Sequence, residues 1–199
     1  MCSSDLTATG ASERHDMQLY LFNSRDHSAF PERVAFIGSP IAFSLLASLQ
    51  RPRSRGKLTL ATTDPHVQPT LTLNYLSDPE DMRRMVEAVR IAWEIGKSPA
   101  IQAFVERAVL LTDEMVASDT AVEAYLRQMV STIFHPVGTA RMGPDGDERA
   151  VVDGQCRVRG VEGLRVVDAS IMPTIPRANT NLTCIMIGER VADWMRAEA

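Results

Sequence analysis

The sequence predicts a fold of mixed α+β and α/β class, in which an antiparallel sheet with helices is followed by a final strand–loop–helix unit. Leucines alternate with polar residues over 57–61 and again over 70–75, which is the period of antiparallel strands with one exposed face. Apolar residues then recur at helical spacing over 79–96. Near the end, the β-prone run LRVVDAS at 164–170 leads through an irregular stretch to a helical pattern at 181–196.

The part of the chain before residue 50 contains one expected tail and three expected strands. Residues 1–14 are polar and lack the apolar core of a signal peptide, so we expect a disordered tail of non-native origin. Strands are expected at 17–22, 34–37 and 41–48, of which the last two are separated by a Gly-Ser-Pro break. This break leaves no apolar run of the roughly 20 residues that a membrane-spanning helix needs, so no transmembrane segment is expected.

Three helices are expected in the middle of the chain. The first covers 79–96, because Asp78 can cap its start, a proline occupies its first position and a glycine ends it. A weaker pattern predicts a second helix over 99–110. The third covers 119–132, where apolar residues share one face and Ser118 precedes the start. The predicted order is therefore sheet, three helices, loop, and then strand, loop and helix.

The last part of the chain has the pattern of a ligand-binding segment. Residues 134–148 form a loop rich in glycine and proline, and 151–159 carry a hairpin signal around an Asp-Gly turn. The strand at 164–170 and the helix at 181–196 place the loop between them at the carboxyl end of the strand, where open α/β sheets bind ligands. The amino end of a helix carries partial positive charge, which suits a phosphate or an anionic ring.

Composition excludes several classes of function. The chain has 199 residues and a net charge of −4, whereas a protein that binds nucleic acid is usually basic. Its three cysteines are far apart and odd in number, which argues against a disulfide framework and for a reducing compartment. The four histidines have no metal-ligand spacing, so no metal site is expected. We therefore expect no nucleic-acid partner and a cytoplasmic protein, with peripheral attachment to a membrane as the alternative.

His135 is the first candidate for chemistry. It lies in the stretch FHPVGTARMG, where Pro136 restricts the backbone and Gly138 leaves space for a ligand. An imidazole is well suited to accept a proton near neutral pH. A capping or core histidine is the structural alternative, and spacing alone does not decide between the two readings.

Two further segments contain candidate site residues. Asn181 lies at the expected start of the last helix, where its amide can bind a substrate hydroxyl or a developing alkoxide, or can simply cap the helix. Asp168 ends the predicted strand and can position a cofactor together with the small Ala169, or can form only a turn. The sequence contains no GxSxG, GxGxxG or P-loop motif.

Five consecutive blocks of the sequence resemble the glucose–methanol–choline (GMC) oxidoreductase family. They are PRSRGKLTL, YLSDPEDM, HPVGTARMG, VVDGQCRVRGVEGLRVVDASIMP and NTNLTCIMIGERVADW, and they follow the family's order across most of residues 50–197. The resemblance is to the carboxyl-terminal part of the family, and its nearest kind is the choline-dehydrogenase-like alcohol dehydrogenases. One departure is Ala140, at a position where the family usually has a cysteine.

The resemblance implies parts of two domains. Residues 15–133 would belong to a substrate-binding domain of antiparallel sheet and helices. Residues 134–199 would form the carboxyl-terminal part of an FAD-binding, Rossmann-like domain, with the catalytic loop. Because the family's GxGxxG motif does not occur in this sequence, the resemblance implies a fragment that lacks the amino-terminal FAD-binding portion.

The resemblance also implies a reaction, the oxidation of an alcohol to a carbonyl compound with FAD as cofactor. His135 would take the hydroxyl proton, with Asn181 as the second catalytic residue, while the carbinol hydride passes to flavin N5. The implied cofactor-binding residues are Asp168, Ala169, Asn181 and Thr183. The implied partners are a small-molecule alcohol and an electron acceptor, which is either a quinone or oxygen.

Two alternatives to alcohol oxidation stay open at this point. One is a lyase of the hydroxynitrile-lyase kind, which has the same fold, contains FAD and splits cyanohydrins without net redox change. The other is an inactive, truncated remnant that only supplies structure to a partner.

Overall fold

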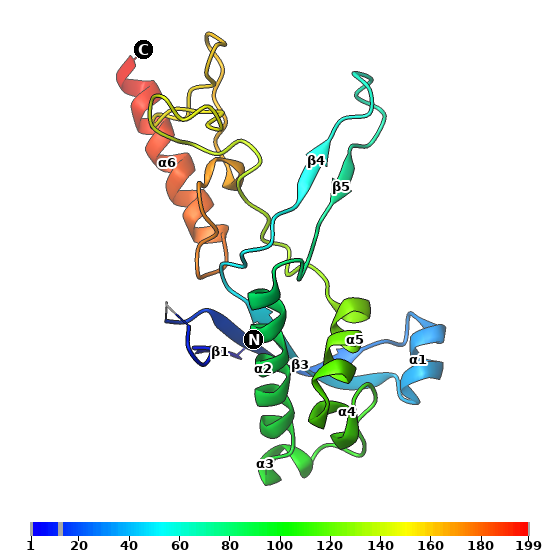
Figure 1. Cartoon of the computed structure of the whole chain (residues 1–199). Helices are drawn as coiled ribbons and strands as arrows, with labels where there is room; N and C mark the ends of the chain where they lie inside the picture. The colour runs from blue at the N-terminus through cyan, green and yellow to red at the C-terminus, as the bar shows by residue number, and fades with distance from the viewer. Residues whose placement is uncertain (1, 12–13, 199) are drawn as a thin grey trace. The chain divides into compact units, whose positions relative to one another are not determined.

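The structure, a computed structural model, describes residues 2–11 and 14–198. The chain divides into two compact units, which Figure 1 shows along one chain trace. The first unit is Met1–Arg55 with Asn74–Ser131, and the second is Gly56–Leu73 with Thr132–Ala199. The segment Gly56–Leu73 thus groups with the carboxyl-terminal residues, whereas the sequence placed it with the sheet and helices before residue 134.

An antiparallel sheet of three strands, in the order β1-β2-β3, belongs to the first unit. The strands are β1 (Cys2–Leu6), β2 (Met17–Asp26) and β3 (Ile41–Leu49). The strands expected at 17–22 and 41–48 are therefore confirmed, and β2 is longer than the apolar pattern predicted.

The disordered tail is a wrong prediction for the part of it that the structure describes. Cys2 pairs with Leu21 in the antiparallel register of β1 and β2. Ala8, just after β1, is 2% exposed, and its N–H donates to the Asp16 carboxylate at 2.8 Å. A long neighbouring strand and a buried alanine thus order a segment whose polar composition predicted no structure. Residues 1, 12 and 13 of the expected tail lie outside the described residues.

The strand expected at 34–37 is also a wrong prediction, because these residues lie in helix α1 (Pro31–Ile37). Pro31 occupies the first turn, and Gly38 ends the helix in the left-handed conformation, with φ of 76°. The β-prone run VAFI favoured a strand, but the proline before it and the glycine after it are helix-boundary signals and decide the structure.

Helices α2 (Pro79–Gly96) and α5 (Asp119–Met129) confirm the two stronger helix predictions. Both begin at the expected caps, since the side chains of Asp78 and Ser118 each accept a hydrogen bond from a backbone N–H of the first turn. The agreement is close because each helix has a cap signal and a periodic apolar face in one continuous stretch.

The helix expected over 99–110 is wrong beyond its first turn. Helix α3 (Pro99–Gln102) is short, and Phe104 beyond it is 89% exposed, so the apolar residues that follow have no core on which to extend a helix. A separate helix that the sequence did not predict, α4 (Asp113–Ala117), begins where the Thr112 hydroxyl accepts a backbone hydrogen bond.

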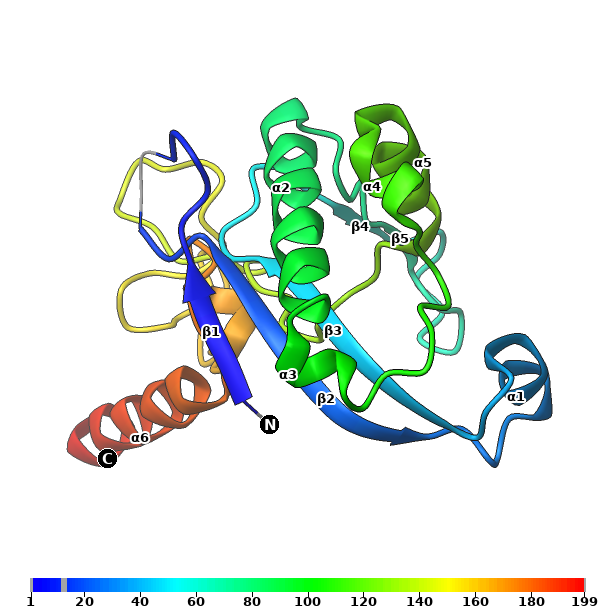
Figure 2. The ribbon, with the colours of Figure 1, turned by 90° about the horizontal axis from the view of Figure 1, so that it is seen from below.

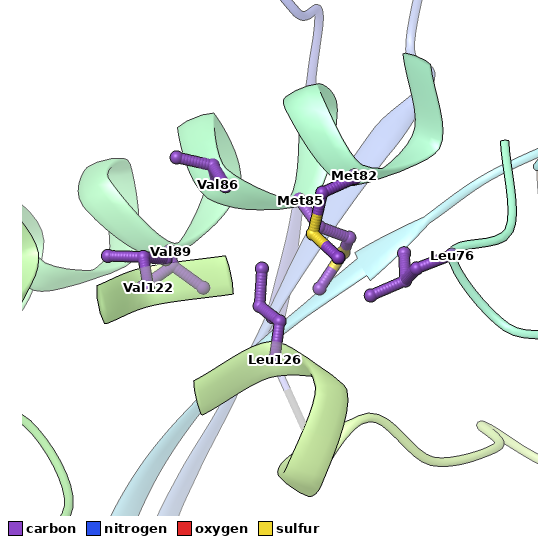
Figure 3. Close-up of a cluster of buried hydrophobic side chains, with 7 residues drawn as sticks. All are labelled: Leu76, Met82, Met85, Val86, Val89, Val122 and Leu126. Carbon is purple, nitrogen blue, oxygen red and sulfur yellow. The ribbon is translucent and has the colours of Figure 1, made fainter. Parts of the chain in front are cut away.

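The helices of the first unit pack on its sheet and on each other (Figure 2). Helix α2 packs against β3 on one side and against α5 on the other. The buried apolar cluster of α2 and α5, shown in Figure 3, consists of Leu76, Met82, Met85, Val86, Val89, Val122 and Leu126. The periodic residues of the two predicted helices therefore form most of this core.

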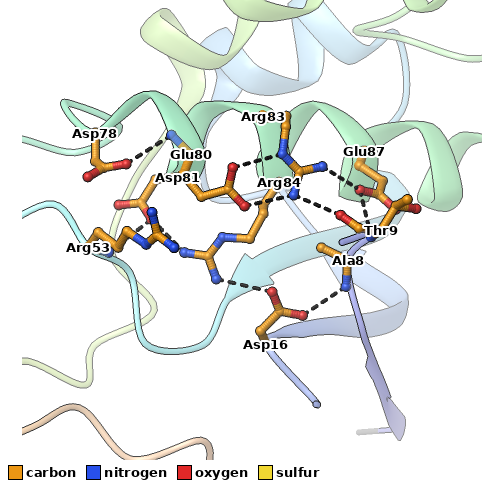
Figure 4. Close-up of polar contacts among 10 residues, drawn as sticks. All are labelled: Ala8, Thr9, Asp16, Arg53, Asp78, Glu80, Asp81, Arg83, Arg84 and Glu87. Atoms are coloured by element: carbon orange, nitrogen blue, oxygen red, sulfur yellow. Dashed lines mark hydrogen bonds and ion pairs between the residues drawn. The ribbon is translucent and has the colours of Figure 1, made fainter. Parts of the chain in front are cut away.

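Three charged side chains are buried together in the same unit (Figure 4). Asp81 is 0% exposed, and the Arg84 guanidinium pairs with both Asp81 and Asp16. The Asp81 carboxylate also accepts hydrogen bonds from the N–H groups of Arg53 and Ser54, at 2.9 and 2.7 Å. This buried network ties the PRSRG turn, residues 52–56, to α2 and to Asp16, the residue before β2.

The buried network predicts a pH dependence of stability. Burial raises the pKa of Asp81, but hydrogen bonds from Ser54, Arg53 and Arg84 lower it by more, so the pKa lies below its ordinary value. Because the folded pKa is depressed, ionised Asp81 contributes stability above the unfolded pKa of about 4 and loses it as pH falls through the folded pKa. We expect the difference in free energy of unfolding between the parent and Asp81→Asn to shrink below about pH 4. Urea unfolding at a series of pH values measures this difference, and a constant difference down to about pH 3 would contradict the expectation.

The second unit contains few regular elements. The antiparallel hairpin of β4 (Lys57–Thr59) and β5 (Thr70–Thr72) confirms the strands predicted from alternating leucines. Helix α6 (Asn181–Glu198) confirms the last predicted helix, and a short 3₁₀ turn, η1 (Ala169–Ile171), precedes it.

The strand expected at 164–170 is a wrong prediction. This run forms a single bridge, between Arg157 and Arg165, and Val167 is 37% exposed rather than buried. The hairpin expected at 151–159 is reduced to one antiparallel bridge between two valines. The run does exchange backbone hydrogen bonds with Cys156 and Val158 on one flank and with the loop 134–142 on the other, but these bonds form no continuous ladder of the kind that defines a strand.

Helix α6 has one packed side and one exposed side. The buried cluster of the second unit consists of Val152, Cys156, Ile171, Met172, Ile187 and Val191. By contrast, α6 also carries apolar side chains that are each more than half exposed, at Leu182, Ile185, Met186 and Met195. Within residues 2–11 and 14–198, no helix combines the length and the apolar character needed to cross a membrane.

Candidate functional site

The candidate site lies in the second unit, where the loop 134–142 runs beside residues 168–172. The N–H groups of Gly138, Ala140 and Met142 donate to the carbonyl oxygens of Ala169, Ser170 and Ile171, at 3.3, 3.0 and 2.7 Å. These backbone hydrogen bonds hold the HPVGT loop in a fixed register against the DASI segment. The start of α6 contacts the same loop through His135.

The local sequence explains why this loop has a defined shape. Gly138 has φ of 86°, which favours glycine, and a Cβ there would lie 3.3 Å from the Met172 carbonyl oxygen. Val137 packs against the buried cluster of the unit. Phe134 is in the left-handed region with φ of 64°, a strained conformation for an aromatic residue. The backbone is therefore constrained on both sides of His135.

The imidazole of His135 contacts the start of α6. Its Nδ1 lies 3.2 Å from Oγ1 of Thr180, the residue directly before the helix. Thr180 is 8% exposed, and its carbonyl oxygen accepts the N–H of Cys184 at 2.9 Å, which is a hydrogen bond of helical type. The ring of His135 is half-buried, so it is not the fully packed core histidine of the structural alternative.

The other predicted site residues flank this contact. Asn181 is the first residue of α6 and is exposed, and Thr183 in the first turn is half-buried. Ala169 is half-buried and packs against the cluster of the unit. Asp168 is exposed, and its carboxylate accepts the Ser170 N–H at 2.8 Å, so it makes the turn that the structural alternative described. The structure therefore brings His135 to the helix start and lays its loop against Ala169, while Asp168 contacts its own turn.

Sequence reasoning did not predict the contact between His135 and Thr180. The sequence shows only a threonine between two asparagines at an expected helix start, and this pattern predicts contacts with neighbouring residues alone. A contact between side chains 45 positions apart does not follow from such spacing.

The residues of this site fit a flavin, the cofactor that the resemblance implies. Helix α6 has 18 residues and an exposed first residue, so the partial positive charge of its amino end is accessible to an anionic ring. His135 supplies a proton acceptor at the same helix end. Among residues 2–11 and 14–198, no group of three metal-ligating side chains occurs.

A hollow of about 420 Å³ in the first unit offers different chemistry. It lies at α4 and α5 and is lined mainly by apolar side chains, which include Phe36, Tyr125 and Met129. None of the predicted site residues and no histidine lines it. The predicted site residues all lie in the second unit.

Comparison with known proteins identifies the class to which this fold and site belong. Residues 52–188 match the family model described as GMC oxidoreductase. The chain belongs to the GMC oxidoreductase family, and the resemblance seen in the sequence is confirmed.

Curated relatives of the chain share one description. An oxygen-dependent choline dehydrogenase from Klebsiella pneumoniae subsp. pneumoniae is 45% identical over 151 residues, which are 76% of this chain and 26% of the relative. One from Escherichia coli O139:H28 is 37% identical over 205 residues, which cover 96% of this chain and 36% of the relative. The matches thus span between 26% and 36% of the length of these relatives.

Two solved structures have a similar fold. Pyridoxine 4-oxidase from Mesorbium loti has a TM-score of 0.81 at 24% identity, over 98% of this chain and 37% of that one, and shows likeness of fold alone. A formate oxidase from Aspergillus oryzae RIB40, studied for the effect of a mutation on FAD modification, has a TM-score of 0.81 at 28% identity. That match covers 94% of this chain and 32% of that one. The matched third of each oxidase therefore has the predicted combination of antiparallel sheet and helices.

Proposed function

We propose that this chain is the carboxyl-terminal part of an FAD-dependent enzyme that oxidises an alcohol to a carbonyl compound. The observation that carries the proposal is the contact between His135 and the start of α6, in a member of the GMC oxidoreductase family. This contact holds an imidazole beside the partial positive charge of a helix end. Such an oxidation needs a proton acceptor and a place for an anionic ring, and we propose that His135 and the amino end of α6 supply them.

In the proposed reaction, His135 accepts the proton of the substrate hydroxyl, and the amide of Asn181 donates a hydrogen bond to the same oxygen. Bound FAD would supply the acceptor for the hydride that leaves the carbinol carbon. The residues proposed to hold the cofactor are Asp168, Ala169, Asn181 and Thr183. A quinone or oxygen is proposed as the final electron acceptor.

The rest of such an enzyme is proposed to cover the exposed apolar side of α6. Leu182, Ile185 and Met186 lie close together on this side and are each more than half exposed. Apolar side chains grouped on one helix side favour burial against another surface. Because the sequence has no GxGxxG motif, another part of the enzyme is also needed to grip the ADP half of FAD. The chain by itself is therefore expected to bind FAD weakly.

A chimaera tests the proposed function. It joins this chain to the part of the Escherichia coli relative that the chain does not match. We expect the purified chimaera to retain FAD and to reduce a redox dye when an alcohol is added. Choline is the first alcohol to test, because the curated relatives are described as choline dehydrogenases. The isolated chain is the control and should retain little FAD. A chimaera that retains FAD but reduces no dye with choline or with other primary and secondary alcohols would overturn the proposed activity.

A further inference from the structure

We propose that Thr180 is a positioning residue for His135, and that it fixes the ring tautomer that leaves Nε2 free to accept a proton. The inference rests on the proposed function of His135 as the base. It assigns to the Thr180 hydroxyl oxygen the role of accepting a hydrogen bond from Nδ1–H of the imidazole.

The backbones of both partners are held in place. The Thr180 carbonyl oxygen accepts a helical hydrogen bond from Cys184, and the β-branched Thr180 side chain has few rotamers. His135 lies between the constrained Phe134 and the rigid Pro136. The distance of 3.2 Å between Oγ1 and Nδ1 therefore joins two anchored residues, so the hydrogen bond restrains the imidazole ring itself.

The position of the single proton on the neutral imidazole decides whether Nε2 can accept the proton of the substrate. A neutral imidazole carries one proton, and only its other nitrogen can accept a second. When Nδ1–H donates to Thr180, Nε2 is the acceptor, and the same hydrogen bond persists after the ring becomes an imidazolium. When the Thr180 hydroxyl donates to Nδ1 instead, Nε2 already carries the proton and has no lone pair to offer. The first arrangement needs no rearrangement during proton transfer.

NMR spectroscopy of the isotope-labelled chain tests this inference without FAD or alcohol. Long-range proton–nitrogen correlation spectra distinguish a protonated ring nitrogen from an unprotonated one, and the His135 signals are those lost in His135→Gln. At about pH 8.5, where an ordinary imidazole is neutral, we expect the His135 proton mainly on Nδ1. In Thr180→Val, which keeps the side-chain shape but lacks the hydroxyl, we expect it mainly on Nε2, the tautomer that free histidine prefers.

Two further variants distinguish the effect of losing the Thr180 hydroxyl from other effects of a substitution. Thr180→Ser keeps a hydroxyl and should restore the proton on Nδ1. Thr139→Val alters a threonine in the His135 loop, and it should leave the His135 signals unchanged.

Each outcome of the NMR experiment either supports or overturns the role proposed for Thr180. A parent chain with its His135 proton on Nε2 overturns it without any variant, so the test stands even where Thr180→Val does not fold. An Nδ1 proton that survives in folded Thr180→Val overturns it as well. The result is separate from the chimaera experiment, because an inert chimaera would refute alcohol oxidation and leave the tautomer of His135 as measured.

Discussion

Replacement of His135 by alanine is expected to lower the turnover of the FAD-loaded chimaera by about 10²–10⁴-fold. Without a positioned acceptor, the hydroxyl proton must leave to water as the hydride departs. The loop itself should keep its shape, because backbone hydrogen bonds from Gly138, Ala140 and Met142 hold it independently of the imidazole. The measurement is kcat at saturating alcohol and dye, divided by the FAD content of each preparation.

His66→Ala is the matched control for this experiment. His66 is exposed in the β4–β5 connection, where its N–H donates to the Asp64 carboxylate at 2.9 Å. Its imidazole has no role in the proposed reaction, so turnover should stay close to that of the parent. If the His135 and His66 variants have equal turnover, the base is another group and the proposed role of His135 is refuted.

Asp81→Asn is expected to lower the free energy of unfolding of the first unit by about 3–5 kcal/mol. The variant keeps the volume of the side chain but replaces a carboxylate oxygen by an NH₂ group. This group would face the N–H of either Arg53 or Ser54, because these two N–H groups donate to different oxygens of Asp81, and a buried donor that loses its acceptor is costly. Arg84 would also lose one of its two carboxylate partners.

The two tryptophans make the unfolding of the first unit measurable. Trp93 belongs to the first unit and Trp194 to the second, so a Trp194→Phe background leaves Trp93 fluorescence as the reporter during urea unfolding. Glu80→Gln in the same background is the control, because its ion pair with Arg83 is partly exposed and such pairs contribute about 0–1 kcal/mol. An Asp81 variant that is no less stable than the Glu80 variant would show that the buried network does not hold the turn to α2.

The helices that the sequence predicted well are those whose signals lie in one short stretch. In α2 and α5, a capping side chain is followed directly by an apolar face that forms the core. β1 shows the opposite case, because its residues are polar and become a strand only by pairing with β2. In α1, the boundary signals of Pro31 and Gly38 outweigh a β-prone run.

The candidate site was predictable in part for the same reason. HPVGT and NTN are short continuous motifs, so the sequence alone could identify His135 and the start of α6 as candidates. The contact between them could not be predicted, because it depends on how the loop 134–142 pairs with residues 168–172. The run 164–170 has the composition of a buried strand, but its own residues cannot supply the strands with which it would pair.

The most direct measurement of the central claim is the absorption of FAD in the chimaera when an alcohol is added without oxygen. If the His135 site oxidises alcohols, the visible flavin band bleaches as two electrons leave the substrate, and air or a quinone restores it. If the band is unchanged for choline and every other alcohol tested, while a cyanohydrin is split, the protein is a lyase and the account is wrong.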